Sequence, residues 1–271
     1  MGLLEALVLG VVQGLTEFLP ISSSAHLVLV PELLGWEEPS LAYVVLLHAG
    51  TLLALVIYFR NELIATLTGM LRPGPARKFV LLLVAGTLPA AVIGVAFEEQ
   101  FERNFGEPFQ VALQLVATGV ILIGIEALAR RKPPPPEDAG DLTGLEGLTG
   151  QLTPAKAAGV GLAQAFAIVP GISRSGATIA AGLLAGLSRA QAARFSFLLS
   201  IPILFGTTLF KVPDLAGESV GTGALVVGFV ASLVTGYLAI AGTISFLQRR
   251  GLLSFAAYCV LAGGLAALLL R

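Results

Sequence analysis

The chain has 271 residues, of which 56% are hydrophobic and only 12% are charged, and its mean hydropathy is +0.89. Soluble domains carry about 25% charged residues, so this composition excludes an ordinary soluble domain and indicates an integral membrane protein. The formal net charge of −1 argues against a nucleic-acid partner, which would require a basic surface. The single cysteine, Cys259, rules out a disulfide framework within the chain.

Residues 3–34 do not have the pattern of an ordinary membrane span. An apolar stretch ends near Glu17 and Pro20, three serines and His26 follow at once, and a second apolar stretch runs from Leu27 to Leu34. Two half-length helices joined by a polar turn describe a re-entrant hairpin. Non-helical backbone at membrane depth is tolerated only inside the protein or beside a wet cavity, so this hairpin predicts a cavity.

The rest of the chain contains apolar runs of about 20 residues, the length that crosses a bilayer as a helix. Transmembrane helices are predicted at about 41–59, 79–97, 109–129, 192–210, 222–247 and 252–270. Residues 133–154 hold four consecutive prolines followed by glycine, threonine and acidic residues, a composition typical of a flexible linker. The linker divides the chain into residues 1–132 and residues 155–271.

The two halves match each other at a constant offset of 151 residues. The matched pairs are Gln13 and Gln164, Ile21 and Ile172, Ser22 and Ser173, Ser24 and Ser175, Gly35 and Gly186, Phe59 and Phe210, and Arg60 and Lys211. One offset kept from Gln13 to Arg60 favours a duplication over chance. A second re-entrant hairpin is therefore predicted at about 155–187.

Each half would hold one hairpin and three spans, and an odd number of crossings inverts the second half relative to the first. The positive-inside rule agrees, because it places the basic loops 60–78 and 130–132 in the cytoplasm and the acidic loop 98–107 outside. The predicted fold is an all-α integral membrane protein with an inverted-topology repeat and both termini outside. In such proteins, broken helices from the two halves build a site near the midplane.

The tip of the second hairpin has the sequence PGISRSGAT at 170–178. A Gly/Ser turn at a helix N-terminus offers backbone N–H groups to an anion, and Arg174 adds a fork of donors that suits phosphate oxygens. An arginine at membrane depth is costly unless it is paired or bound to an anion, so a phosphate-type ligand is predicted. The alternative is a helix cap in which Arg174 reaches the interface or a structural carboxylate.

The tip of the first hairpin brings a carboxylate, hydroxyls and an imidazole together. Gln13 and Glu17 lie on one helix face, and Ser22 and Ser23 are within reach of His26. Such groups around a diphosphate would supply a metal ligand or base, a nucleophile or donor, and a general acid. The alternatives are a hydrogen-bonded core histidine and serines that cap a helix. His48, the other histidine, is predicted to be structural.

The segments QGLTEFLPISSSAHL and PGISRSGATI, the latter followed by LSRAQAARFSFLLSIP, resemble the bacterial undecaprenyl-diphosphate phosphatase family associated with bacitracin resistance. The resemblance covers essentially the whole chain. It implies hydrolysis of undecaprenyl diphosphate to undecaprenyl phosphate and inorganic phosphate, which recycles the lipid carrier for cell-wall synthesis. It also implies a location in the bacterial plasma membrane, a site that opens outward, and a divalent cation such as Mg²⁺, with Ca²⁺ as the alternative.

By position, the resemblance assigns the family's acidic pair to Gln13 and Glu17 and its catalytic serine and histidine to Ser23 and His26. Its phosphate-binding Ser-Arg-Ser falls on residues 173–175, so Arg174 joins the predicted catalytic set. Gln13 replaces an acidic residue, so Glu17 alone is the predicted metal ligand. Ala25 stands where glycine is common in the family. Substrate binding is predicted at Gln13, Ser22, Ser24, Gln164, Ser173, Ser175, Gly176 and Thr178. The spacing leaves serine, histidine and water open as the nucleophile.

A transporter or flippase of an anionic prenyl-phosphate lipid is the second predicted function, because an inverted repeat is a carrier architecture. A structural scaffold is a weaker alternative, since it gives no reason for a buried polar cluster. The predicted partners are a polyprenyl diphosphate and the bilayer, and no nucleic acid. A homo-oligomer is not predicted, and the prenyl tail is expected between the spans.

Overall fold

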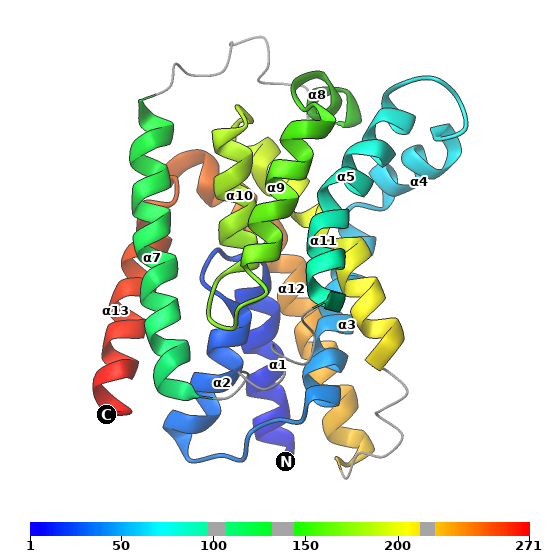
Figure 1. Ribbon diagram of the computed structural model, residues 1–271. Helices are drawn as coiled ribbons and strands as arrows, with labels where there is room; N and C mark the ends of the chain where they lie inside the picture. Colours follow the sequence, from blue (N-terminus) through cyan, green and yellow to red (C-terminus); the bar gives the residue numbers. More distant parts are fainter. Residues whose placement is uncertain (97–106, 132–143, 212–219) are drawn as a thin grey trace.

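The computed structural model describes residues 1–96, 107–131, 144–211 and 220–271, and within these ranges every regular element is a helix (Figure 1). The helices are α1 (Leu3–Phe18), α2 (Ser23–Leu34), α3 (Leu41–Tyr58), α4 (Arg60–Gly69), α5 (Pro75–Ala96), α7 (Pro108–Arg130), α8 (Leu145–Gln151), α9 (Pro154–Phe166), α10 (Arg174–Leu184), α11 (Arg189–Lys211), α12 (Thr222–Arg250) and α13 (Leu253–Leu269).

The helix lengths agree with a multi-pass membrane protein. Five of the described helices, α3, α5, α7, α11 and α12, are long and apolar enough to cross a bilayer. The last predicted span, 252–270, corresponds to α13, which has 17 residues and is also apolar. The predicted all-α membrane fold is therefore confirmed.

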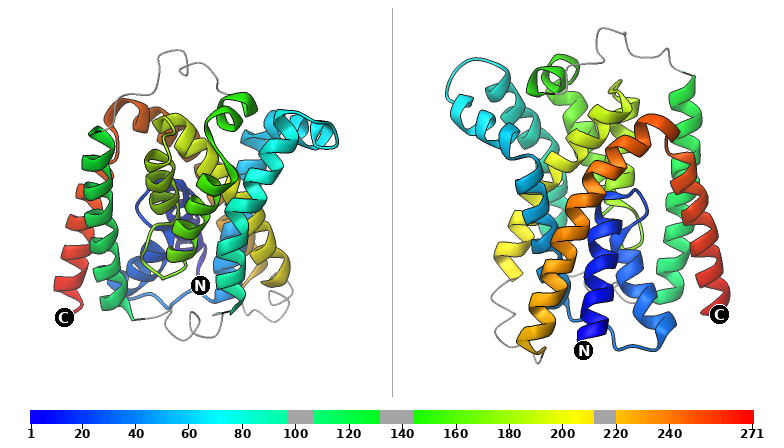
Figure 2. Two further views of the ribbon diagram at one scale, coloured as in Figure 1. Left: turned by 45° about the horizontal axis from the view of Figure 1, so that its top comes forward. Right: turned by 180° about the vertical axis from the view of Figure 1, so that it is seen from behind.

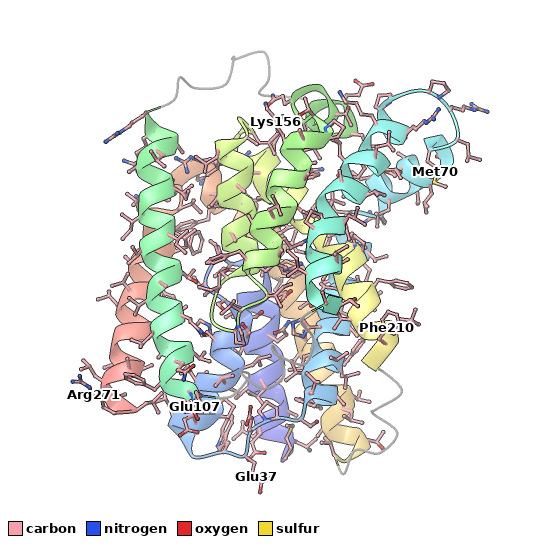
Figure 3. The ribbon with its side chains drawn as sticks, in the orientation of Figure 1. Glu37, Met70, Glu107, Lys156, Phe210 and Arg271 are labelled. Carbon is pink, nitrogen blue, oxygen red and sulfur yellow. The ribbon has the colours of Figure 1, made fainter. Side chains whose placement is uncertain are left out.

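Two pairs of short helices enter the helical bundle from opposite ends. The α1–α2 pair comes from the end that holds both chain termini, the α9–α10 pair comes from the other end, and their tips meet inside the bundle (Figures 1 and 2). These pairs fall at the two predicted hairpins. The acidic Glu37 and Glu107 lie at the end with the termini, and Lys156 lies at the opposite end (Figure 3).

The second helix of each pair begins in the same way, and a glycine with a positive φ, Gly35 or Gly186, lies just after its last turn. Helix α2 begins at Ser23 and α10 begins at Arg174, 151 residues later. The preceding serine in each case, Ser22 or Ser173, accepts a hydrogen bond from the backbone N–H three residues on, which caps the helix. Gly35 ends α2 with a φ of 65°, the left-handed conformation that glycine adopts without strain.

Small residues allow the helices to approach closely, as in membrane proteins where the lipid is as apolar as the side chains. A Cβ atom on Gly10 of α1 would meet the backbone of Gly228 in α12, and one on Gly161 of α9 would meet the backbone of Gly86 in α5. Gly161 lies 151 residues after Gly10, so the same kind of contact recurs in both halves. A duplication would produce this recurrence, and the inverted repeat itself stays a prediction.

Two segments differ from the sequence-based expectation. Residues 60–78, expected to be a loop, contain all of α4 and the start of α5. The predicted linker 133–154 contains α8, and Leu148 of α8 and Leu152 just after it are buried in the main apolar core. Four of its five prolines stand at 133–136, so the composition of the whole segment concealed a short helix after them. Residues 132–143, most of the acidic loop 98–107, and residues 212–219 lie outside the described ranges.

Candidate active site

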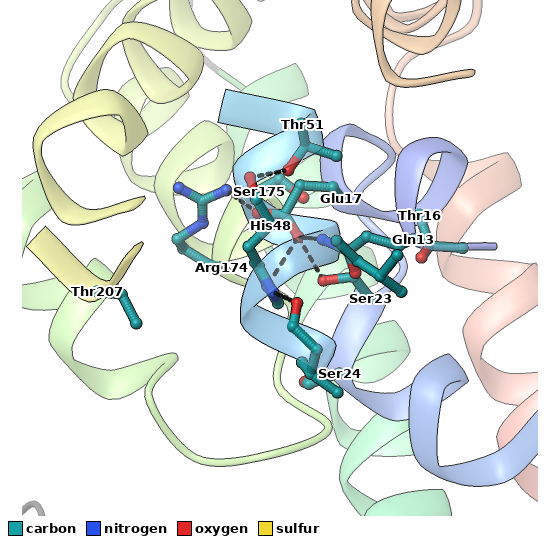
Figure 4. Close-up of polar contacts among 12 residues, drawn as sticks. Gln13, Thr16, Glu17, Ser23, Ser24, His48, Thr51, Arg174, Ser175 and Thr207 are labelled. Carbon is teal, nitrogen blue, oxygen red and sulfur yellow. Dashed lines mark hydrogen bonds and ion pairs between the residues drawn. The ribbon is translucent and has the colours of Figure 1, made fainter. Parts of the chain in front are cut away.

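The polar residues of both hairpin tips gather where the tips meet (Figure 4). The last turns of α1 supply Gln13 and Glu17, the first turn of α2 supplies Ser23, and the start of α10 supplies Arg174. Phe18, beside Glu17, packs edge-on against Phe197 of α11 at 5.3 Å between ring centroids. The cluster therefore rests on an apolar layer in the interior of the bundle.

Glu17 is the centre of this cluster, and its side chain is only 5% exposed. Its Oε1 accepts a hydrogen bond of 2.5 Å from Nη2 of Arg174, which comes from the opposite hairpin. Its Oε2 accepts bonds of 2.6 Å from the Ser23 hydroxyl and 3.0 Å from Nε2 of Gln13. A buried carboxylate needs such compensation, so the Glu17 charge links the two halves of the chain.

Two polar atoms of the cluster are buried and, within the described ranges, have no hydrogen-bond partner. They are Nη1 of Arg174 and Oε1 of Gln13. An unpaired guanidinium N–H in the interior is costly, whereas an anion beside it would satisfy that donor. Arg174 thus bonds to Glu17 through Nη2, whereas its buried Nη1 has no hydrogen-bond partner in the described ranges.

The tips are also joined directly by serine side chains. The backbone N–H of Gly171 donates to Oγ of Ser24 over 3.3 Å, and Oγ of Ser175 donates to the carbonyl of Leu19 over 2.9 Å. Each tip has one internal serine pair as well, at 3.1 Å between Ser22 and Ser24 and 3.2 Å between Ser173 and Ser175. The predicted binding serines thus shape the tips, and Ser22 and Ser173 act as helix caps.

The two histidines of the chain face different partners. His26 directs Nε2 to the hydroxyl of Tyr258 in α13, at 2.7 Å, rather than to Glu17. His48 of α3, expected to be structural, places Nε2 only 3.6 Å from Oε2 of Glu17. This distance exceeds a normal hydrogen bond but lies within ion-pair range. The contact between α1 and α3 brings this ring to the carboxylate, and the structural role expected for His48 stays a prediction.

The comparisons with known proteins agree with the resemblance carried by the two tips. Residues 6–265 match the model of one family, the bacitracin resistance protein BacA. The chain belongs to the BacA family. Full-length relatives named undecaprenyl-diphosphatase include those of Geobacter sulfurreducens, 44% identical over 97% of both chains, and Pelobacter propionicus, 43% identical over 97% of this chain and 96% of the relative. That of Rubrobacter xylanophilus is 43% identical over 99% of this chain and 98% of the relative.

Three predicted binding residues of this BacA-family chain bond to other groups of the protein or have no polar partner in the described ranges. The Thr178 hydroxyl donates to the carbonyl of Arg174 over 2.8 Å and lies 2.5 Å from Oγ of Ser196, so it faces α11. The N–H of Gly176 is used by the Ser173 cap. Gln164 is buried, and its amide atoms have no partner in the described ranges. In the first half, Gln13, the counterpart of Gln164, donates to Glu17. The residue 151 positions after Glu17 is Ile168, so Gln164 has no carboxylate to bind.

A residue that no sequence motif marks also shapes the second tip. Thr118 of α7 accepts a hydrogen bond of 3.2 Å from the N–H of Ser173 and donates one of 3.1 Å to the carbonyl of Gly171. Gly171 has a φ of 86°, which glycine tolerates and other residues rarely adopt. A single threonine inside an apolar span gives no signal for such a role, because its partners are more than fifty residues away along the chain.

A divalent cation fits this BacA-family site only with help from a substrate. In the described part of the chain no three His, Cys, Asp or Glu residues are grouped as a metal site. The carboxylate of Glu17 and the unpartnered Oε1 of Gln13 are nonetheless oxygen donors, the type that Mg²⁺ and Ca²⁺ prefer. Mg²⁺ is often bound by one or two protein oxygens together with phosphates and water, so these two donors suit that mode.

Proposed function

We propose that this BacA-family protein hydrolyses undecaprenyl diphosphate to undecaprenyl phosphate and inorganic phosphate. The observation that carries the proposal is the arrangement around Glu17, where a serine hydroxyl lies 2.6 Å from the carboxylate beside an arginine whose Nη1 is unpartnered. Hydrolysis of a phosphoanhydride needs a nucleophile, a proton acceptor and a cationic group for the phosphate oxygens. The names of the curated relatives support the same reaction.

In the proposed mechanism, Nη1 of Arg174 binds an oxygen of the terminal phosphate. Ser23 attacks its phosphorus, Oε2 of Glu17 takes the hydroxyl proton, and the bond to the bridging oxygen breaks to release undecaprenyl phosphate. Water then hydrolyses the phosphoserine with His26 as the acid–base group, and inorganic phosphate leaves. We favour Ser23 over His26 as the nucleophile because Ser23 already donates to Glu17, whereas both ring nitrogens of His26 have other partners.

Oε1 of Gln13 and the Glu17 carboxylate, before it takes the Ser23 proton, would hold a divalent cation, Mg²⁺ or Ca²⁺, together with the phosphates of the lipid. When bound, the cation would neutralise charge on the diphosphate. Arg174 keeps Glu17 in place from the opposite hairpin, and Ser24 and Ser175 hold the two tips at a fixed separation. The reacting groups are thus positioned before the substrate arrives, which is the main source of rate in phosphoryl transfer.

The decisive experiment measures phosphate release from undecaprenyl or farnesyl diphosphate by the purified protein in detergent. We expect release that EDTA abolishes and that added Mg²⁺ restores. Ser23→Ala should lower kcat on the order of 10³-fold or more, as expected for loss of a nucleophile. Ser254→Ala, an exposed serine on α13, is the matched control and should keep wild-type activity. Wild-type protein that releases no phosphate with any divalent cation would refute the proposal.

The transporter alternative gives a different outcome for Glu17→Gln. An enzyme should lose phosphate release while still binding the lipid, whereas a carrier should lose translocation and have no hydrolysis to lose. Rapid-quench trapping of phosphorylated protein tests the serine step. If active protein never carries phosphate, water is the nucleophile and Ser23 only orients the substrate.

We also propose a location in the bacterial plasma membrane with both termini and the mouth of the site outside. The support is that both termini lie at the same end as the acidic Glu37 and Glu107. Cys259 is buried, so cysteines introduced at Glu37 and Lys156, both exposed, can be labelled against a low background. In intact cells, a membrane-impermeant maleimide should label the cysteine at 37 and not the one at 156. The reverse pattern would refute this orientation.

A further inference from the structure

The imidazole of His26 is held at both ring nitrogens. Nδ1 lies 2.7 Å from the carbonyl oxygen of Ser22, and Nε2 lies 2.7 Å from the hydroxyl of Tyr258. A carbonyl can only accept a hydrogen bond, so Nδ1 carries the proton of the neutral ring. Nε2 then has the lone pair, and the Tyr258 hydroxyl donates to it. One tautomer and one orientation of the ring satisfy both contacts.

His26 and His48 have the same kind of partner at Nδ1 and different partners at Nε2. His48 makes the same local contact, with Nδ1 lying 2.8 Å from the carbonyl of Val44, four residues earlier. In both histidines the backbone of their own helix sets the tautomer, and only the partner of Nε2 differs. For His48 this partner is Glu17, and for His26 it is a tyrosine that lies 232 residues further along the chain.

The packing of α13 places Tyr258 against the first tip. The ring of Tyr258 stacks on that of His26 with 5.7 Å between centroids and 10° between planes. The next residue, Cys259, lies with Sγ 3.8 Å from the carbonyl oxygen of Pro20, in the turn between α1 and α2. Two consecutive residues of α13 thus contact the first tip, Tyr258 at His26 of α2 and Cys259 at the turn before it, so the fold holds the tyrosine hydroxyl at His26.

We propose that Tyr258 is a positioning residue for His26. A hydroxyl both donates and accepts, so it can keep its bond to Nε2 whether this atom is neutral or protonated. The ring therefore keeps its place beside Ser22 and Ser23 through changes of charge during turnover. This inference rests on the proposed hydrolysis, in which small displacements of a reacting group are costly in rate.

The test replaces Tyr258 with phenylalanine, which removes the hydroxyl and keeps the ring. Tyr237→Phe is the matched control, because Tyr237 lies in α12, is 38% exposed compared with 43% for Tyr258, and contacts Tyr58 instead of a histidine. Tyr258→Phe should lower kcat about tenfold with KM within twofold, less than the loss of a complete acid–base group. Tyr237→Phe should change neither constant.

A spectroscopic measurement separates positioning from a general structural effect. The chain has two histidines, so ¹⁵N ring labelling gives two imidazoles, and His26→Ala identifies which signals belong to His26. In Tyr258→Phe, the Nε2 signal of His26 should move toward the value of a nitrogen without a hydrogen bond, and the His48 signals should stay.

An unchanged Nε2 signal in Tyr258→Phe would overturn the proposal, and so would a kcat equal to that of Tyr237→Phe. Wild-type protein without phosphate release would instead overturn the proposed function. In that event, the Nε2 signal of His26 would still test whether Tyr258 donates a hydrogen bond to this nitrogen.

Discussion

Replacing Arg174 with methionine should destabilise the protein because it removes the partner of a buried charge. Oε1 of Glu17 loses its 2.5 Å hydrogen bond to the guanidinium, while Oε2 keeps its bonds to Ser23 and Gln13. Removing one partner of a buried ion pair lowers the free energy of unfolding by about 3–5 kcal/mol. Because Glu17 keeps two hydrogen bonds in Arg174→Met, we expect a loss at the lower end of this range, about 3 kcal/mol. At about 2–4 °C per kcal/mol for a chain of this size class, Tm should fall by about 6–12 °C.

The second variant in this experiment combines Glu17→Gln with Arg174→Met. It removes the charge together with its partner, so most of the lost stability should return, while phosphate release stays abolished in both variants. Thermal unfolding in detergent, followed by circular dichroism, measures the stability. Arg250→Met, at an exposed position at the end of α12, is the control and should stay within about 0.5 kcal/mol of wild type.

Two results would refute this reasoning. If Arg174→Met unfolded at the wild-type temperature, the Glu17 charge would not depend on the arginine. If the double variant were as unstable as Arg174→Met, the cost would come from lost packing of the arginine side chain and not from an uncompensated carboxylate.

Three further predictions use the same unfolding assay. Glu126→Gln should lower the free energy of unfolding by about 3 kcal/mol, because fully buried Glu126 accepts two hydrogen bonds of 2.7 Å from Arg189. The folded variant should still release phosphate, and a folded but inactive variant would contradict this prediction. Gly14→Ala should lower the free energy of unfolding by about 1–3 kcal/mol, since the added Cβ would meet the backbone of α12. An unchanged Tm would show that α1 and α12 can move apart without loss of stability. Ser175→Ala should cost about 1 kcal/mol through the lost bond to Leu19, and a larger loss would imply further contacts.

Much of the fold follows from patterns that are local in the sequence. The apolar runs predict the long helices because lipid requires about 20 apolar residues per crossing. The hairpins were predictable because Pro20 and the serines interrupt an apolar stretch and a matching interruption occurs 151 residues later. The observed starts of α2 and α10 keep this offset. By contrast, α8 was missed because the prolines before it dominated the composition of the segment.

The candidate site was only partly predictable. Glu17 and Arg174 were named from the sequence because charged groups in an apolar chain need partners, and Ser23 was assigned by the family resemblance. The structure places both Ser23 and Arg174 in direct contact with Glu17. His48 and Tyr258 were not named as site residues. Each is an isolated polar residue in an apolar run, and nothing in its neighbourhood distinguishes a residue of the site from a core or lipid-facing one. In the structure Thr178 faces α11, where its hydroxyl lies 2.5 Å from Oγ of Ser196.

The sequence by itself determined that this is an α-helical membrane protein with two polar helix breaks, since helix length, capping and i,i+4 neighbours depend only on nearby residues. Tertiary structure alone decided which of these groups meet. The ion pair of Glu17 and Arg174 spans 157 residues, and the bond of His26 to Tyr258 spans 232. Such contacts depend on how each helix is rotated and how closely it packs, as at Gly14 against α12. That rotation is set by the interlocking of side chains from the whole bundle, which no local pattern encodes.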